Sequence, residues 1–346
     1  MAGEVKEVDP TSPSVSGRPD VSVLIIAHSR RQYLRRAITS VKSQNLGGTR
    51  CELVVLKSFD DKELEASMTA PDIHMITLPE GTLGEHLARG ITECSGDVVS
   101  FLDDDDTFCQ EKVAWVASHF DADPALAYLH NGYDLLRDDG TKVRRLIHPT
   151  NHIRLKIQSG PHDPRIVETV VRKDLAINLS SLSMRRAILL QKLEQLRSVR
   201  GASDYCMFYT ALASGGSLLF EPNRLTIYYV HPSSMRPGGR RSDPAEFVRT
   251  LAEFQLQTQD YGLTLPKESG VGRAAAALHS EWELVLALVS QTSRRTAVRR
   301  FVEFVKRGWA SRKRLVVMAS FVMCAKLIFP HFGESLFLAM RQIIQD

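Results

Sequence analysis

Four consecutive aspartates, Asp103 to Asp106, follow the mainly apolar run 98–102 and are the residues best suited to chemistry. Neighbouring carboxylates repel, and at an effective dielectric constant near 20 each adjacent pair costs on the order of a few kcal/mol unless a cation lies among them. Hard oxygen ligands suit Mg²⁺ or Mn²⁺, which bridge carboxylates to substrate phosphates. The motif predicts a metal site for a nucleotide diphosphate, and the alternative is a solvated acidic turn.

The segments that must position these aspartates alternate between strand and helix patterns. Continuous aliphatic runs predict strands of a parallel sheet at 21–27, 52–56, 73–76 and 97–102. Amphipathic stretches predict helices at 33–41, 61–68 and 83–95. The first helix is expected to turn Arg35, Arg36 and Lys42 away from its apolar stripe. Because ligands of open α/β sheets bind beyond the carboxyl ends of strands, the aspartates lie where a ligand is expected.

The composition is that of a globular protein of 346 residues with a formal net charge of +4. Its five cysteines are scattered and form no Cys-x-x-Cys pair, which argues against a disulfide framework or a zinc ribbon. Residues 1–19 lack an apolar core and are predicted to be a disordered leader. A change to mainly helical sequence predicts a domain boundary near Gly239.

The C-terminal region 240–346 combines a basic stretch with an apolar one. Nine arginines and lysines and a single acid, Glu303, lie between Arg294 and Arg314. The apolar segment 315–340 is too interrupted for a spanning helix of about 20 residues, so peripheral contact with anionic headgroups is expected. The alternatives are a soluble bundle with a solvated basic face or a nucleic-acid patch, and no recognised motif supports nucleic acid as a partner.

Two segments resemble family 2 glycosyltransferases, the inverting GT-A group. They are residues 21–44, which begin Val-Ser-Val-Leu-Ile-Ile-Ala, and residues 96–106, which end in the four aspartates. The resemblance implies a GT-A α/β fold over 20–239, a Rossmann-like mixed sheet flanked by helices, with a helical C-terminal extension. It also implies metal-dependent, inverting transfer of a sugar from a nucleotide-diphosphate donor to an acceptor hydroxyl. The basic and apolar C-terminus further predicts that the acceptor is a glycan or a polyprenyl-linked glycan. It also predicts that the protein acts in the cytoplasm or at the inner face of the cell membrane.

In that family the acidic motif holds the metal and the donor diphosphate. The resemblance implies Asp105 and Asp103 as ligands of Mn²⁺ or Mg²⁺, with Asp103 and Asp104 also near the ribose and Asp106 supporting them. The metal would stabilise the charge of the departing nucleoside diphosphate. His231 is implied to reach the metal or the diphosphate, and its alternative role is to cap a strand.

The end of the first strand contacts the nucleotide in this family. Ala27, His28 and Arg30 take that place, with His28 stacking on the base and Arg30 near the pyrophosphate. His28 could equally be a turn residue. Lys57 stands where the family usually has acids that recognise the base, so the base is undefined. Lys57 cannot accept a hydrogen bond from a base imide, which leaves contact with phosphate or a surface position.

Asp204 matches the second, catalytic acid of the family's Glu-Asp or Asp-Asp motif. Inversion needs a carboxylate opposite the leaving group to take the proton of the acceptor hydroxyl. The other interpretation of Ser203 and Asp204 is an N-cap of a helix over 205–213. The basic loops 161–165 and 236–241 are candidate lids over the diphosphate or plain linkers.

Two other functions stay open. A sugar-phosphate nucleotidyltransferase has a similar sheet, although no Gly-rich phosphate loop follows the first strand here. An inactive nucleotide-sugar-binding or membrane scaffold module would fit Lys57 and Leu87-Ala88, which depart from the family pattern.

Overall fold

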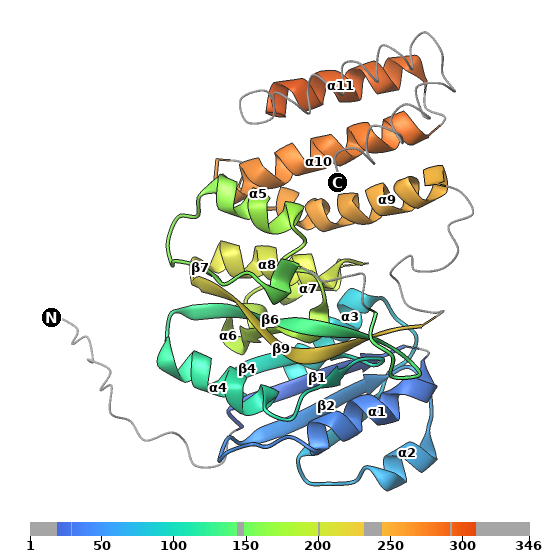
Figure 1. Cartoon of the computed structure of the whole chain (residues 1–346), viewed down its shortest axis with the longest axis vertical. Coiled ribbons are helices and arrows are strands. Elements are labelled where there is room, and N and C mark those ends of the chain that lie inside the picture. The colour runs from blue at the N-terminus through green and yellow to red at the C-terminus, as the bar shows by residue number, and fades with distance from the viewer. Residues whose placement is uncertain are drawn as a thin grey trace, which may run out of the picture.

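Parallel strands from the first half of the chain form one part of the sheet (Figure 1). The computed structural model describes residues 19–28, 30–143, 149–199, 201–231, 244–266, 268–290 and 293–308. The four strands are β1 (Val21–Ala27), β2 (Cys51–Lys57), β3 (Ile73–Thr77) and β4 (Val98–Asp103). They pair in the order β3-β2-β1-β4, all parallel, which confirms the predicted strands.

The carboxyl ends of these strands meet at one edge of the sheet. Ala27 lies opposite Lys57 on β2, and Ile26 lies opposite Asp103 on β4. Strands β1, β2 and β4 are buried along almost their whole length, which explains why their sequences are continuously apolar rather than alternating. This register places the start of the acidic motif at the edge where ligands of such sheets bind.

Helices cover both faces of this sheet. The helices of the first half are α1 (Arg31–Lys42), α2 (Lys62–Ser67), α3 (Leu83–Glu93) and α4 (Lys112–Ala122). Helices α1, α2 and α4 share one apolar cluster with the sheet, whereas α3 contributes to the cluster on the other face. Helix α3 begins with a capping box formed by Thr82 and Glu85, which satisfies backbone donors that a helix start leaves unpaired.

The second half adds strands of both directions. They are β5 (Thr107–Phe108), β6 (Leu126–Arg137), β7 (Leu155–Ile157), β8 (Leu182–Arg185) and β9 (Ser217–Val230). Strand β8 is antiparallel to β4 and β6, whereas β9 is parallel to β6 and antiparallel to β5. Thr107, directly after the aspartates, pairs with Ile227, so the end of β9 returns to the acidic motif. The sheet is therefore mixed, as predicted.

Further helices connect these strands, and several of them contribute to the apolar cluster on the face of the sheet that α3 covers. They are η1 (Pro149–Asn151), α5 (Pro164–Arg172), η2 (Leu179–Ser181), α6 (Arg186–Leu190), α7 (Leu193–Arg197) and α8 (Ser203–Ser214). Helix α8 is buried along most of its length, and Tyr205, Phe208 and Tyr209 are among the largest fully buried side chains. The start of α8 is consequently held in a dry and densely packed environment.

The predicted helical extension is present as α9 (Pro244–Leu263), α10 (Gly270–Val289) and α11 (Arg294–Gly308), stacked above α5 and α8 in Figure 1. Tyr209 donates a hydrogen bond of 2.5 Å to Gln259, and Thr210 and Tyr261 lie 2.8 Å apart. Residues 1–18 of the predicted leader, the predicted boundary at Gly239 and the apolar segment 315–340 lie outside the described residues. No helix among the described residues is both long and apolar enough to cross a membrane.

Candidate active site

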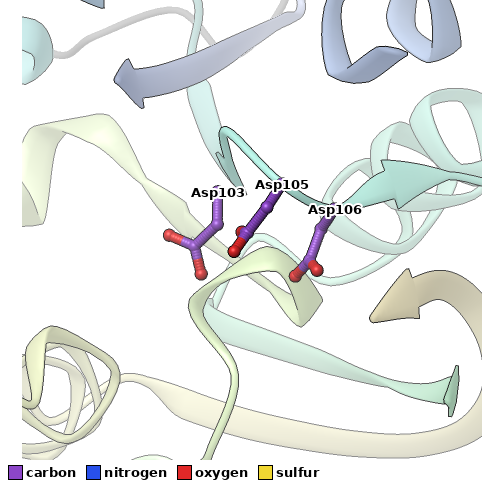
Figure 2. A group of neighbouring side chains, drawn as sticks. All are labelled: Asp103, Asp105 and Asp106. Atoms are coloured by element: carbon purple, nitrogen blue, oxygen red, sulfur yellow. The ribbon is translucent and has the colours of Figure 1, made fainter. Parts of the chain in front are cut away.

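The acidic motif forms a tight turn at the end of β4. Asp106 donates its backbone N–H to the carbonyl of Asp103 over 3.2 Å. Asp104, Asp105 and Asp106 are buried, whereas Asp103 is partly exposed. One carboxylate oxygen from each of Asp103, Asp105 and Asp106 lies within 4.8 Å of the others, and Figure 2 shows the three side chains on the same side of the turn. The motif is therefore a cluster of convergent carboxylates and not a solvated acidic turn.

Asp106 is fixed by bonds to two distant segments. Its Oδ2 accepts a hydrogen bond of 2.6 Å from the hydroxyl of Ser180, and its Oδ1 accepts one of 3.1 Å from the backbone N–H of Tyr229. The same Ser180 hydroxyl accepts the N–H of Asp103 over 3.0 Å. With both oxygens engaged, Asp106 supports the turn, and Ser180 ties the two ends of the motif together.

A buried lysine, Lys112, holds Ser180 in place. Its ammonium nitrogen lies 2.5 Å from the carbonyl oxygen of Ser180 and 3.0 Å from the hydroxyl oxygen of Thr226. Burial lowers the pKa of Lys112 well below its usual range, although Cys109 and Asp106 oppose this shift. Sequence reasoning missed Lys112, because a lysine at the start of an amphipathic helix is usually solvated.

Two basic side chains meet on Asp105. Arg30 forms ion pairs with Asp105 and, at 2.6 Å, with Asp104. The Nε2 atom of His231, directly after β9, lies 2.9 Å from the Oδ2 atom of Asp105. His231 is 7% exposed, and its ring centroid is 4.3 Å from that of Tyr33. The structure thus brings together three residues predicted for the diphosphate and metal.

Arg36 lies at this site although the amphipathic pattern of α1 predicts that it points away. Its guanidinium donates to the carbonyl of Asp105 over 3.0 Å and stacks on the ring of Tyr229, 3.4 Å from the ring centroid. The prediction for Arg36 was wrong because a long side chain at the border of an apolar stripe can bend over the helix end toward a polar edge.

The electrostatics of the cluster favour a bound cation. Burial, reinforced by the charge of Asp105, raises the pKa of Asp103 to about 7 despite the opposing charge of Arg30. Burial likewise raises the pKa of Asp104 to about 7 against the pull of Arg30, and it raises that of Asp106 well above its usual range. Arg30 alone does not neutralise four carboxylates. The convergent oxygens of Asp103 and Asp105, with the His231 ring beside them, fit a hard divalent ion.

We expect the stability of the metal-free protein to fall as pH rises through about 7. Asp103 and Asp104 have folded-state pKa values of about 7 and an ordinary pKa of 3.8, so between these limits the folded state binds protons that the unfolded chain does not. This contribution to stability is fully present below pH 3.8 and is lost as the pH rises through about 7. The check is urea denaturation with chelator at about pH 5.5 and pH 8. Greater stability at the higher pH, or the same pH difference in the Asp103→Asn/Asp104→Asn variant, would contradict it.

The residues predicted for the base lie at the ends of β1 and β2. Ala27 is buried, and its carbonyl accepts the N–H of Ser58 over 3.1 Å. His28 is exposed, with its Nδ1 3.4 Å from the hydroxyl of Ser58 and its ring 5.9 Å from that of His86. An exposed ring at this edge is free to stack on a base.

Lys57 is buried and does not occupy the surface position that was one of its two predicted environments. It is 1% exposed, and its ammonium lies 2.9 Å from the carbonyl of Phe59, 2.6 Å from the hydroxyl of Thr77 and 2.6 Å from the carboxylate of Glu65. Lys57 is therefore not a surface lysine. Its ammonium is engaged on the side of α2 and β3, and contact with phosphate stays a prediction.

Asp204 lies beside the acidic motif but does not cap its helix. The N-cap of α8 is Ala202, in a left-handed conformation, and Asp204 lies within the first turn. One Asp204 oxygen accepts the N–H of Tyr205 and the other accepts the N–H of Asn178, each at 2.9 Å. The N-cap interpretation was wrong, because the N-cap is the left-handed Ala202, one residue before Ser203 and two before Asp204. Asp204 is linked to the acidic motif through η2, because it binds Asn178, and Ser180, two residues further on, bonds to both Asp103 and Asp106. The charge of Asp204 also contributes to the raised pKa of Asp103, after burial and the charges of Asp105, Arg30 and Asp104.

The two predicted lid loops differ in what the structure describes. In the loop 161–165, Asp163 caps α5. The carbonyl oxygen of His162 lies so close to Gly270, at the start of α10, that a Cβ atom on Gly270 would be only 2.6 Å from it. This loop therefore packs against the start of α10, as a linker would. The loop 236–241 lies outside the described residues.

Comparison with known proteins agrees with this geometry. The sequence model of the family described as Glycosyl transferase family 2 matches residues 22–177, from β1 to the segment before η2. These residues form a family 2 glycosyltransferase domain. A protein of Bacillus subtilis (strain 168) named as a putative glycosyltransferase of teichuronic acid biosynthesis, TuaG, is 27% identical over 146 residues. The match covers 38% of this chain. The match spans about half of that relative, 53% of its length.

Solved structures share the fold of this chain over most of its length. TarS 1-349 of S. aureus, in complex with UDP-GlcNAc, has a TM-score of 0.59 at 15% identity and covers 93% of this chain and 92% of its own. The mannosyltransferase PcManGT of Pyrobaculum calidifontis, in complex with GDP-Man and Mn²⁺, has a TM-score of 0.52 at 15% identity. The match covers 97% of this chain and 90% of PcManGT. The predicted GT-A fold with a helical C-terminal region is confirmed.

Proposed function

We propose that the chain is a metal-dependent, inverting glycosyltransferase that moves a sugar from a nucleotide-diphosphate donor to an acceptor hydroxyl. The observation that carries this proposal is the convergence of Asp103, Asp105 and Asp106 at the carboxyl edge of the family 2 sheet, with Asp204 beside them. A nucleotide-sugar donor is further supported by the UDP-GlcNAc and GDP-Man of the two similar structures.

Asp105, Asp103 and His231 are the proposed ligands of Mn²⁺ or Mg²⁺. Carboxylate oxygens of Asp103 and Asp105 lie within 4.8 Å of each other, and the His231 Nε2 atom lies 2.9 Å from the Oδ2 atom of Asp105. When bound, the ion would act as a Lewis acid on the departing diphosphate. Asp106 and Ser180 hold the turn, so that the ligands need little rearrangement. Arg30 contributes a guanidinium to the pyrophosphate, for which its partly exposed side chain next to the motif is suited. Ala27, His28 and Asp104 contact the base and ribose.

Asp204 is the proposed catalytic base. It takes the proton of the acceptor hydroxyl while the acceptor oxygen bonds to the sugar carbon and the bond from that carbon to the diphosphate oxygen breaks. The backbone N–H groups of Asn178 and Tyr205 fix the direction of the Asp204 carboxylate. Attack from the face opposite the leaving group inverts the sugar carbon.

The acceptor is proposed to be a glycan or a polyprenyl-linked glycan, and the protein to act in the cytoplasm at the inner face of the cell membrane. The name of the similar TuaG, from teichuronic acid biosynthesis, supports a polymer as the acceptor class. The basic C-terminal stretch supports peripheral membrane contact, because each cation near an anionic leaflet contributes about 1 kcal/mol.

The test is a thermal shift against UDP, GDP and CDP, each with Mn²⁺ and with chelator, followed by an assay of nucleoside diphosphate release from the matching sugar donors. A ligand at 100 times its Kd stabilises by about 2.7 kcal/mol, which is easily measured. We expect a metal-dependent shift with one nucleotide and release of that diphosphate. Binding without release would indicate an inactive nucleotide-sugar-binding module. Formation of a nucleotide sugar from a sugar phosphate and a nucleoside triphosphate would indicate a nucleotidyltransferase.

A further inference from the structure

The outermost helix, α11, carries an unusual surface. Among the described residues, the exposed large hydrophobic side chains are Val298 and Val302, at 40% and 42% exposure. They are four residues apart and therefore adjacent on one face of the helix. Figure 1 shows α11 at the end of the stack, beyond α10 and on the side away from the sheet. Two neighbouring exposed valines on the most distal helix suggest a surface that is covered in use.

The same face of α11 is cationic. Arg295, Arg299 and Lys306 are exposed, and their spacing from the two valines places all five side chains within an arc of about 100°. We name these five residues the outer stripe of α11. Glu303, at the margin of the stripe, lies 3.7 Å from Lys306 and is the single acid of the helix sequence. The outer stripe is thus a positively charged surface with two apolar side chains in its middle.

The orientation of α11 is fixed by its other side. Ala297 and Phe304 are each 2% exposed and face the rest of the protein. Arg300 forms an ion pair with Glu283 of α10 and so, unlike the arginines of the outer stripe, is already neutralised within the fold. Because the inward side is packed and paired, the outer stripe faces away from α10.

We propose that the outer stripe of α11 docks the protein on an anionic lipid surface. This inference rests on the proposed function, for which it names the surface that brings the active site to a lipid-linked acceptor. The arginines and the lysine attract acidic headgroups, and the two valines enter the headgroup region between them. A surface that needed only to remain solvated would gain nothing from exposed valines.

Charge decides between this partner and two others. A second copy of α11 would bring one cationic stripe against another, which is repulsive. The remaining C-terminal sequence, residues 309–346, has five arginines and lysines and two acids, so as a cover it would also oppose positive charge with positive charge. An anionic lipid surface complements the stripe in both charge and apolar content.

The experiment is co-sedimentation of the full chain with vesicles of phosphatidylcholine alone and with about one-third phosphatidylglycerol. We expect binding to the anionic vesicles and little binding to the neutral ones. Arg295→Gln/Arg299→Gln should weaken binding about 30-fold, since two cations at about 1 kcal/mol each are lost. Val298→Ser/Val302→Ser should weaken it as well at high salt, where electrostatic attraction is screened.

The matched control is Lys62→Gln/Arg89→Gln, which removes the same charge from exposed positions on α2 and α3. It should bind vesicles as well as the wild type. Equal binding by the α11 variant and this control would overturn the proposal, because the lipid contact would then lie elsewhere, for instance within 309–346. Dimerisation that the valine variant abolishes would overturn the proposal in favour of a second copy of the chain. Binding to polyphosphate but not to vesicles would overturn it in favour of a soluble polyanion. The nucleotide thermal shift of each variant reports on the proposed function separately, because α11 is remote from the aspartates.

Discussion

Replacing Asp105 with Asn is expected to abolish the metal-dependent stabilisation by nucleotide and to lower nucleoside diphosphate release by about 10³-fold. The side chain keeps its shape but loses the charge on which Arg30 and His231 converge. Metal assistance to a leaving group is worth several kcal/mol, and each 1.4 kcal/mol corresponds to tenfold in rate. The measurements are the thermal shift with Mn²⁺ and the release assay, both compared with the wild type.

Asp121→Asn is the matched control for this variant. Asp121 is exposed at the end of α4, so the same chemical change there should leave both measurements unaltered. An Asp105→Asn protein that still shows a metal-dependent nucleotide shift would remove Asp105 from the proposed ligands. The assignment would then pass to Asp103 and Asp106, which share the cluster.

The second large effect is expected for Asp204→Asn, which should retain nucleotide and metal binding but lose transfer by about 10² to 10⁴-fold. The amide still accepts one of the two backbone N–H bonds that the carboxylate accepts, so the start of α8 should keep its position. Because an amide cannot take the proton of the acceptor hydroxyl, the loss should appear in kcat. Transfer kinetics and the nucleotide thermal shift separate these two effects.

A structural explanation for such a loss is tested with Asp174→Asn. Asp174 accepts a hydrogen bond of 3.1 Å from the hydroxyl of Tyr205, the residue that follows Asp204, and therefore supports the same helix from outside the site. Its substitution should lower thermal stability more than activity. If Asp174→Asn and Asp204→Asn lower kcat equally, Asp204 positions α8 and is not the base.

The sequence by itself determined the first half of the fold and the place of the acidic motif. The continuous apolar runs of β1, β2 and β4 and the apolar stripe of α1 are local, periodic signals, and each led to the correct element. Four adjacent aspartates after a strand also favour, through charge repulsion, a bound cation over a solvated acidic turn. The family assignment followed from these same segments, which the family match also covers.

The tertiary structure alone decided which distant groups serve that motif. The parallel course of β9 beside β6 brings His231 to Asp105 across 126 positions of sequence, and Lys112 meets Ser180 across 68. Arg36 was misjudged because helical periodicity reports the direction of the Cα–Cβ bond and not where a long flexible side chain ends. The alternative interpretation of Asp204 as an N-cap failed because residue type does not reveal a left-handed Ala202. Hydrogen bonds between remote segments depend on sheet register and packing, which no local pattern encodes.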